Sequence, residues 1–161
     1  MAVWQFQFNI IPKSVLQQAV GQAPQIISDE MADSLPNWDD SKYKNQEKEL
    51  FSKYLSPKKS WSIDIELWGT EESDCIELIY ESKLLAEFSI RLDLRHFNKK
   101  LIHLIEELGN LFDAVGINEK GEVFPLKSEY LKTEIQKSQA FRFVKDPHAF
   151  LDSLSSKKAE R

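Results

Sequence analysis

Apolar and polar residues alternate along several stretches of this chain, and a period of two is typical of β-strands with one buried face. The first stretch, residues 3–11, alternates aromatic or aliphatic residues with Gln and Asn and is closed by Pro12. Three more strands are predicted in the middle of the chain, at 61–68, 75–80 and 84–95. Because only a short loop and a tight turn separate them, we expect an antiparallel meander with one apolar and one charged face.

The phase of the alternation predicts which side chains of the meander face the core. The residues expected to point inward are Ile63, Ile65, Leu67, Ile76, Leu78, Tyr80, Phe88, Ile90, Leu92 and Leu94. Trp68 and the intervening charged residues fall on the opposite face. One possible register pairs Leu67 with Ile76. It places Glu66 across from Glu77, where nearby arginines would have to offset two like charges.

A period near 3.6 residues predicts several helices. They are expected at 14–20, 42–55, 97–108 and 128–138, with a last helix that begins after Asp146-Pro147. Gly21 and Gly109 are expected to end the first and third helices, since glycine readily adopts the left-handed conformation found there. The remaining segments are predicted to be a hairpin of 112–117 and 123–125 around Gly121, a short strand at 141–144, and a long loop or weak helical turn at 22–41.

These elements predict an α+β fold, a two-layer sandwich in which a mainly antiparallel sheet carries helices on one face. A chain of 161 residues has the size of one domain, and its core needs no disulfide or metal. We expect a single domain over residues 1–154 and a frayed tail at 155–161. The uncovered face of the sheet is then the natural surface for functional side chains.

Composition and charge narrow the classes of function. Cys75 is the only cysteine, which excludes an intramolecular disulfide and fits a reducing compartment. We find no signal-peptide pattern and no apolar run of membrane-spanning length, so a cytoplasmic protein is expected. The net charge of −5 argues against nucleic-acid binding. Residues 61–82 contain seven acidic and no basic residues, and 29–40 contain five and none, which favours a basic partner.

The sequence contains no recognised motif for a catalytic nucleophile, a metal or a nucleotide, and no cofactor is predicted. Cys75 adjoins Asp74, so a reactive thiolate would require the sheet register to place Arg91 across from it. Glu66 and Glu77, if they share a face, resemble the carboxylate pair of a glycosidase. A small hydrolase that uses these residues is the alternative to a protein without catalytic activity.

The charged face of the meander is the best candidate for a functional surface. Arg91, Asp93 and Arg95 are alternate residues of one predicted strand, so they share that face. One interpretation is a solvated network of salt bridges, and the other is a docking surface anchored by Arg and exposed Trp side chains. The residues assigned to partner binding are Trp38, Asp39, Asp40, Asp64, Glu66, Trp68, Glu77, Arg91, Asp93 and Arg95.

Four segments, LPNWDD, SWSIDIELWG, FSIRLDLRHF and KSQAFRFVKDPHAFL, give the chain a resemblance to a class of small bacterial proteins. These are the immunity proteins encoded beside polymorphic or contact-dependent toxins, and the resemblance extends from Leu35 to Leu154. It implies a cytoplasmic inhibitor that neutralises a cognate toxin, often by covering its active site. A basic toxin domain is therefore the expected protein partner, and a homodimer is a further possibility.

Overall fold

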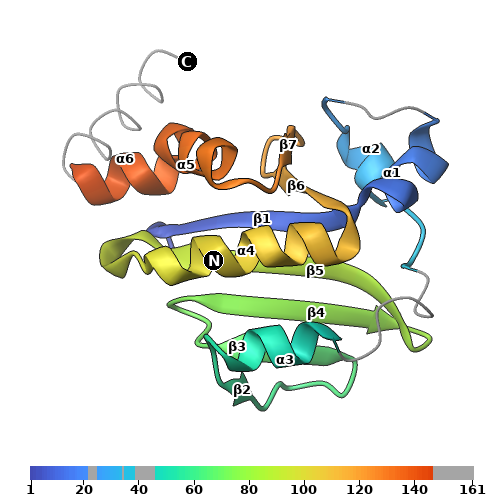
Figure 1. The fold of residues 1–161 in the computed structure, drawn as a ribbon, viewed down its shortest axis with the longest axis horizontal. Helices are drawn as coiled ribbons and strands as arrows, with labels where there is room; N and C mark the ends of the chain where they lie inside the picture. Colours follow the sequence, from blue (N-terminus) through green and yellow to red (C-terminus); the bar gives the residue numbers. More distant parts are fainter. Residues whose placement is uncertain (22–24, 34, 39–45, 147–161) are drawn as a thin grey trace, which may run out of the picture.

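The computed structural model describes residues 1–21, 25–33, 35–38 and 46–146 (Figure 1). Within these ranges the chain forms a seven-stranded antiparallel sheet with strand order β2-β3-β4-β5-β1-β6-β7. The strands are β1 (Gln5–Pro12), β2 (Pro57–Lys58), β3 (Ile65–Gly69), β4 (Cys75–Glu81), β5 (Leu84–Asp93), β6 (Ala114–Asn118) and β7 (Val123–Pro125). The helices are α1 (Lys13–Val20), α2 (Asp29–Asp33), α3 (Gln46–Ser52), α4 (Lys99–Phe112), α5 (Ser128–Lys137), α6 (Gln139–Lys145) and the 3-10 helix η2 (Leu94–His96). The predicted α+β class is confirmed.

The N-terminal strand lies inside the sheet. β1 pairs with β5 from Gln5 to Asn9 and with β6 from Phe8 to Pro12. The predicted meander is formed by β3, β4 and β5, which pair in sequence order. β1 therefore joins the meander to the β6–β7 hairpin.

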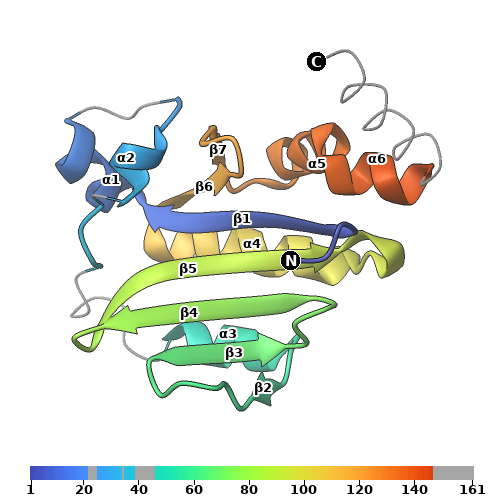
Figure 2. The ribbon, with the colours of Figure 1, turned by 180° about the vertical axis from the view of Figure 1, so that it is seen from behind.

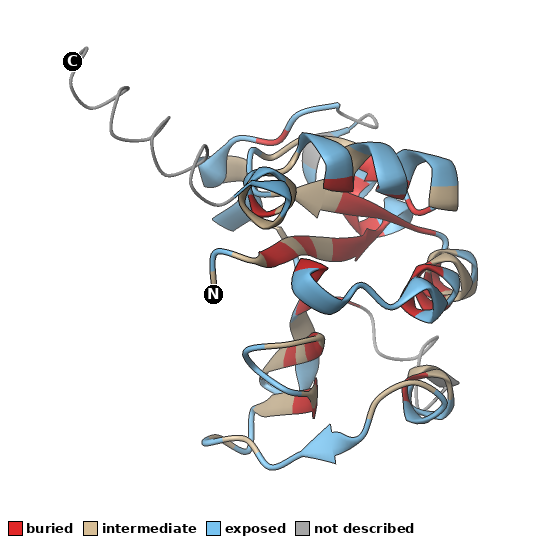
Figure 3. Cartoon of the chain, turned by 90° about the vertical axis from the view of Figure 1, so that its left-hand side faces the viewer, coloured by how far each residue is buried: buried red, intermediate tan, exposed pale blue. Residues whose placement is uncertain are grey.

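Helices α3 and α4 cover one face of the sheet (Figure 1). The fully buried side chains on this side include Phe8, Phe51, Phe88 and Leu108. Phe88 packs edge-on against Phe51 and Phe112, with ring centroids 5.8 and 6.2 Å apart. Figure 3 shows buried residues concentrated on the strands and on the helix surfaces turned toward them. Each such side chain contributes roughly 1.5–3 kcal/mol through burial, so this layer is the main core.

The ends of α4 follow from local hydrogen bonding. The side chain of Asn98 accepts a hydrogen bond from the Lys100 N–H (3.0 Å), which caps the first turn, and Asp113 ends the helix in the left-handed conformation. The predicted end at Gly109 is wrong. A Cβ at Gly109 would lie 2.7 Å from the Cβ of Leu126, so the glycine permits close packing within the helix instead of ending it.

Residues 141–144 belong to α6 and not to the predicted strand. The hydroxyl of Ser138 accepts a hydrogen bond from the backbone N–H of Phe141 (3.1 Å), which caps the helix, and Ala140 is buried against the core. A segment of four residues is compatible with both the strand period of two and the helical period of 3.6, and the Ser138 cap favours the helix.

Other predicted boundaries agree with the structure. α1 ends at Gly21 (φ 80°), and Gly121 has the positive φ expected in the β6–β7 turn (79°). α3 lies within the helix predicted at 42–55. The predicted last helix and tail, residues 147–161, lie outside the described residues. None of the described helices is both long and apolar enough to cross a membrane.

A smaller apolar cluster lies on the other face of the sheet. Ile11 and Val115 point to this side, and Val15, Leu16 and Ile27 pack against them. Figure 2 shows α1 and α2 near this end of the sheet, and no helix of the described ranges in front of β3, β4 and β5. We call this surface over β3, β4, β5 and the adjoining part of β1 the rear face. Several of its side chains, among them Leu67 and Cys75, are nevertheless buried by their neighbours.

Candidate binding face

The rear face is formed by side chains at alternate positions of β4, β5 and β1. They are Cys75, Glu77 and Ile79 of β4, Glu87, Ser89, Arg91 and Asp93 of β5, and Gln5, Gln7 and Asn9 of β1. Cross-strand pairing places Glu77 beside Ser89 and Ser89 beside Asn9. Most of these side chains are polar, so the charged face predicted for β4 and β5 is present.

The predicted phase of β3 is wrong by one residue. Trp68 pairs with Ile76 and therefore faces the core, whereas Leu67 pairs with Glu77 on the rear face. The Trp68 side chain is 7% exposed and packs edge-on against Phe51 (5.5 Å). Both Leu67 and Trp68 are large and apolar, so alternation alone could not decide which faces inward. The larger indole ring occupies the core.

Glu66 lies on the same side as Trp68, close to the core, and not on the rear face. Its carboxylate accepts hydrogen bonds from Trp68 Nε1 (2.8 Å) and from the Tyr80 hydroxyl (3.4 Å), and Lys48 Nζ lies 3.8 Å away. These partners compensate for its partial burial. Glu66 and Glu77 therefore lie on opposite faces of the sheet, which contradicts both their expected pairing and a shared acid/base role.

The other members of the predicted surface outside β4 and β5 are also placed differently. Trp38 is 3% exposed, stacks on Phe88 (5.8 Å between centroids) and is part of the core, so it is not an exposed anchor. Asp64 is exposed in the loop before β3. Asp39 and Asp40 lie outside the described residues.

Asp93 and Arg95 form a structural ion pair at one end of the sheet. Arg95 Nε and Nη2 donate to the two carboxylate oxygens of Asp93 (3.0 and 2.9 Å), and the guanidinium lies 3.9 Å above the Trp4 ring. Asp93 is 1% exposed. Burial alone would raise the pKa of Asp93, but the hydrogen bonds from Arg95 outweigh it and hold that pKa below its ordinary value.

The same end of the sheet is tied to the loop between β3 and β4. Asp74 accepts a hydrogen bond from the backbone N–H of Asp93 (2.8 Å), and Trp4 Nε1 donates to the carbonyl of Glu72 (2.9 Å). The Gln5 side chain donates to the carbonyls of Glu71 and Ser73. These contacts are internal, so this part of the predicted docking surface has a structural role.

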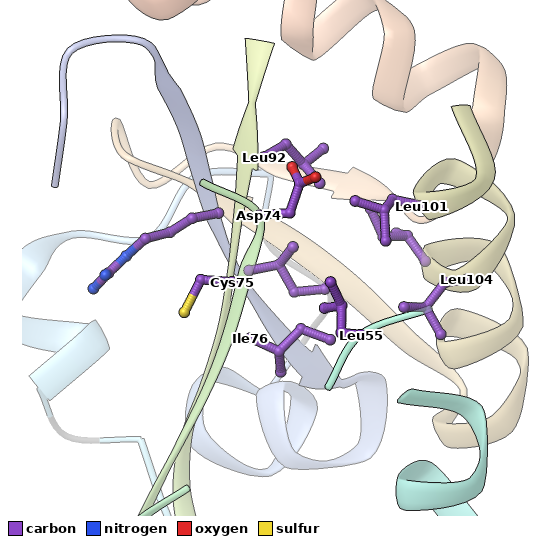
Figure 4. A pocket seen from close by; sticks show the side chains of 10 residues that line it. Leu55, Asp74, Cys75, Ile76, Leu92, Leu101 and Leu104 are labelled. Atoms are coloured by element: carbon purple, nitrogen blue, oxygen red, sulfur yellow. The ribbon is translucent and has the colours of Figure 1, made fainter. Parts of the chain in front are cut away.

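Arg91 lies across from Cys75, in the register that a reactive thiolate would require. Its Nη2 is 3.8 Å from Glu77 Oε2, and both side chains are partly exposed. Cys75 is nevertheless 2% exposed, and burial raises its pKa to about 11 even though Arg91 opposes the shift. In Figure 4 its sulfur points away from Leu101 and Leu104 of α4, toward the rear face. The thiol is therefore neutral and shielded, which disfavours a nucleophilic role.

A small cavity lies between the sheet and α4, lined by Leu55, Leu92, Leu101 and Leu104 (Figure 4). Its volume of about 10 Å³ is at or below what one water molecule needs, and its side-chain lining is mainly apolar. It is a packing gap in the core and not a ligand site.

The rear face contains a larger opening where the sheet splits. The β1–β5 ladder ends at the pair Asn9↔Ser89, although β1 continues beside β6 and β5 continues beside β4. Residues 35–38 cross this split, and the backbone N–H of Trp38 donates to the carbonyl of Leu85 (2.8 Å). Figure 2 shows this segment running from α2 toward the β4–β5 hairpin. The split is therefore closed on the core side by Trp38 and open on the rear face.

A groove of about 360 Å³ occupies the split, and we call it the rear groove. Ile11, Ile79 and Ile117 contribute to its apolar walls. Its carboxylates are Asp33, Glu81 and Glu87, and Asn9 also lines it. Lysine, arginine, histidine, cysteine and serine are all missing from the described residues that line the groove. The rear groove is thus an acidic site with apolar walls.

Two polar groups in the rear groove are suited to a cationic donor. Glu87 is exposed, but partial loss of surrounding solvent raises its pKa, and the charge of Glu77 adds to the shift while Arg91 opposes it. Asn9 Oδ1 is buried and accepts no hydrogen bond in the described structure. Both groups would gain from a cationic hydrogen-bond donor.

Sequence reasoning identified the acidic segments that contain Asp33 and Glu81 but not the rear groove itself. No group of three or more His, Cys, Asp or Glu side chains suited to a metal ion occurs in the ranges that the structure describes. Comparison of the chain with protein-family models, with curated proteins and with solved structures gives no match. Any function assigned to the chain therefore depends on the geometry of the rear face.

Proposed function

We propose that this protein is a non-catalytic binding protein of the immunity type, which binds and neutralises a basic toxin domain through its rear face. The observation that carries the proposal is the rear groove, an acidic opening on the rear face that α2 borders but does not fill. Sheet faces without a covering layer are available to a partner, and aligned carboxylates select a partner of opposite charge.

The charge balance of the rear face supports a basic partner. Glu77, Glu81, Glu87 and Asp33 carry negative charge on or beside the rear groove. Arg91 lies among them, and Lys58 of β2 lies on the same face beside Leu67. A concentration of one charge sign raises the rate of encounter with an oppositely charged protein and disfavours wrong partners. The overall net charge of −5 acts in the same direction.

The alternative function, a small hydrolase, is predicted to use either a reactive Cys75 or a carboxylate pair, and the structure is unfavourable to both. Cys75 is shielded with a raised pKa, and Glu66 and Glu77 are separated by the sheet. Glu87 has the raised pKa of a general acid, but the described groove lining offers neither a nucleophile such as Ser or Cys nor a cation to stabilise developing negative charge. We therefore favour binding over catalysis.

Co-expression tests the proposed function. The tagged chain is produced together with each gene product encoded beside it, and growth and co-purification are measured. We expect one neighbouring product to inhibit growth on its own, to lose that effect when this chain is present, and to co-purify with it as a stable complex. Failure of every neighbouring product to bind, or rescue of growth without a complex, would overturn the proposal.

A further inference from the structure

The size of the rear groove limits what it can hold. Its volume of about 360 Å³ lies at the lower end of the roughly 300–1,000 Å³ found for ligand sites. A folded element such as a helix does not fit in this space, whereas one or two extended side chains do. The groove is therefore suited to a side chain that projects from the surface of a partner.

The groove walls suit a long aliphatic stem. Ile79 of β4 and Ile117 of β6 lie on opposite sides of the split, and Leu35 and Ala86 also line it. Lys and Arg side chains bury their methylene groups against such surfaces while their charged ends reach polar groups.

Acceptors dominate the polar side chains of the groove, and the amides of Asn9 and Asn37 are the described lining side chains that can also donate. Asp33, Glu81 and Glu87 supply carboxylate oxygens, and Asn9 Oδ1 is a buried acceptor without a donor. Leaving a buried acceptor unpaired costs free energy. Asn9 Oδ1 is covered in the described structure, so an occupant recovers this energy by donating to it once the amide turns toward the groove. Arg91 is on the same strand, β5, as Glu87, but its Nη2 atom lies 3.8 Å from Oε2 of Glu77. The occupant must therefore be cationic and rich in donors.

We infer that the rear groove receives an arginine side chain of the partner, with its methylene stem between Ile79 and Ile117 and its guanidinium directed at Glu87 and Asn9. This inference rests on the proposed function and specifies the group that is recognised. Arginine is favoured over lysine because its planar guanidinium presents five donors to acceptors in several directions and is more weakly hydrated.

A small probe tests the groove without the partner. The ¹⁵N-labelled full chain is titrated with N-acetyl-arginine methylamide and, separately, with N-acetyl-citrulline methylamide, which has nearly the same shape without the charge. We expect saturable NMR shifts at the amides of Ile79, Ala86 and Ile117 and at the Asn9 side chain with the arginine probe. The citrulline probe should bind at least roughly tenfold more weakly, as expected when a hydrogen bond to a charged group is lost.

Matched variants locate the site. Glu81→Gln and Glu87→Gln each remove one charge from the groove, whereas Glu71→Gln removes one from the exposed loop at the other end of β4. The two groove variants should each weaken binding of the arginine probe several-fold, and Glu71→Gln should leave it unchanged. The variants keep the side-chain shape, so folding is checked by their unperturbed spectra.

Several results would overturn the inference. These are the absence of saturable shifts, shifts that map outside the groove, equal binding of citrulline, or binding of N-acetyl-lysine methylamide as tight as that of the arginine probe. If the probe fails but a neighbouring gene product still forms the complex, the arginine inference is wrong and the proposed function stands. If the probe binds but no neighbouring product does, the groove is an arginine site and the proposed function is wrong.

Discussion

Arg91, Asp93 and Arg95 follow one another at alternate positions but have separate roles. Asp93, which is buried, and Arg95, which reaches solvent, form an ion pair that ties the end of β5 to Trp4 and to the β3–β4 loop. Arg91 lies farther along the rear face, beside Glu77. The segment therefore combines one structural ion pair with one cation that lies beside acidic side chains of the rear face.

Arg95→Met is expected to lower the free energy of unfolding at neutral pH, because Asp93 stays buried without its guanidinium partner. The loss should be smaller than for a fully buried pair because Arg95 itself reaches solvent. The folded pKa of Asp93 is lowered, so its contribution is complete above its ordinary pKa and is lost as the pH falls through the folded value. Urea unfolding should show a difference between wild type and variant that narrows below about pH 4.

Arg91→Met is the matched control for Arg95→Met. The contact between Arg91 and Glu77 spans 3.8 Å and both partners reach solvent, so its loss should cost at most about 1 kcal/mol. A larger loss for Arg91→Met than for Arg95→Met would show that the structural ion pair has been assigned to the wrong arginine.

Trp38→Ala is expected to destabilise the fold by about 3–5 kcal/mol, because the indole ring is buried between Phe88 and Phe112. Trp61→Ala removes a tryptophan that is 85% exposed and should change stability by less than about 0.5 kcal/mol. Thermal unfolding followed by circular dichroism compares the two. Equal losses would contradict the placement of Trp38 in the core.

At the scale of elements, the strands whose alternation is unambiguous could be predicted from sequence. In β1, in β4 and in β5 from Phe88 onward only one parity is consistently apolar, and that parity faces the core. The register shift between Ile79 and Tyr80 reverses the parity of β5 before Phe88, so that Leu85 packs against the core and Ala86 lines the rear groove. The prediction fails in β3, where adjacent Leu67 and Trp68 are both apolar, and Ile63, expected inward, is 100% exposed before the strand begins. It also fails in α6, because the four residues FRFV at 141–144 are too few to show a clear period.

The turn between β4 and β5 has two residues in the left-handed region, Ser82 (φ 51°) and Lys83 (φ 67°), between the paired residues Glu81 and Leu84. Such two-residue hairpin turns favour glycine at the second position. Lys83→Gly should therefore raise the free energy of unfolding by about 1 kcal/mol, because it relieves the steric cost of a side chain at positive φ. Urea unfolding provides the measurement.

Lys120→Gly, in the β6–β7 turn, is the control for Lys83→Gly. Lys120 does not have positive φ, so the glycine there adds only entropy to the unfolded chain and should lower stability by about 0.5–1 kcal/mol. A gain in stability from both substitutions would indicate a general effect of removing lysine and not relief of the turn.

At the scale of the whole molecule, the rear groove could not be predicted from the sequence. It brings together Asn9, residues 32–33 and 35–38, the β4–β5 hairpin and Ile117, which come from separate parts of the chain. Its existence depends on where the β1–β5 ladder ends and on the anchoring of residues 35–38 by Trp38. Only the acidity of two of its segments is visible in the sequence.

The rear face also bears on the possibility of a homodimer. Two rear faces brought together would place their carboxylates against one another, and like charges across an interface are unfavourable. We therefore expect the isolated protein to be monomeric, with a mass of 18.7 kDa by light scattering. A stable dimer that dissociates on Glu87→Lys would contradict this expectation and show that the rear face binds a second copy.

The central claim is that the rear groove binds a basic partner, and the most direct test is the affinity of the purified complex by isothermal titration calorimetry. The double variant Glu81→Lys/Glu87→Lys reverses two charges at the groove, and Glu71→Lys/Glu72→Lys makes the same change in net charge at the exposed loop on the opposite end of β4. We predict that the groove variant weakens binding at least roughly tenfold more than the loop variant does. Equal effects of the two variants, or full affinity of the groove variant, would contradict the account.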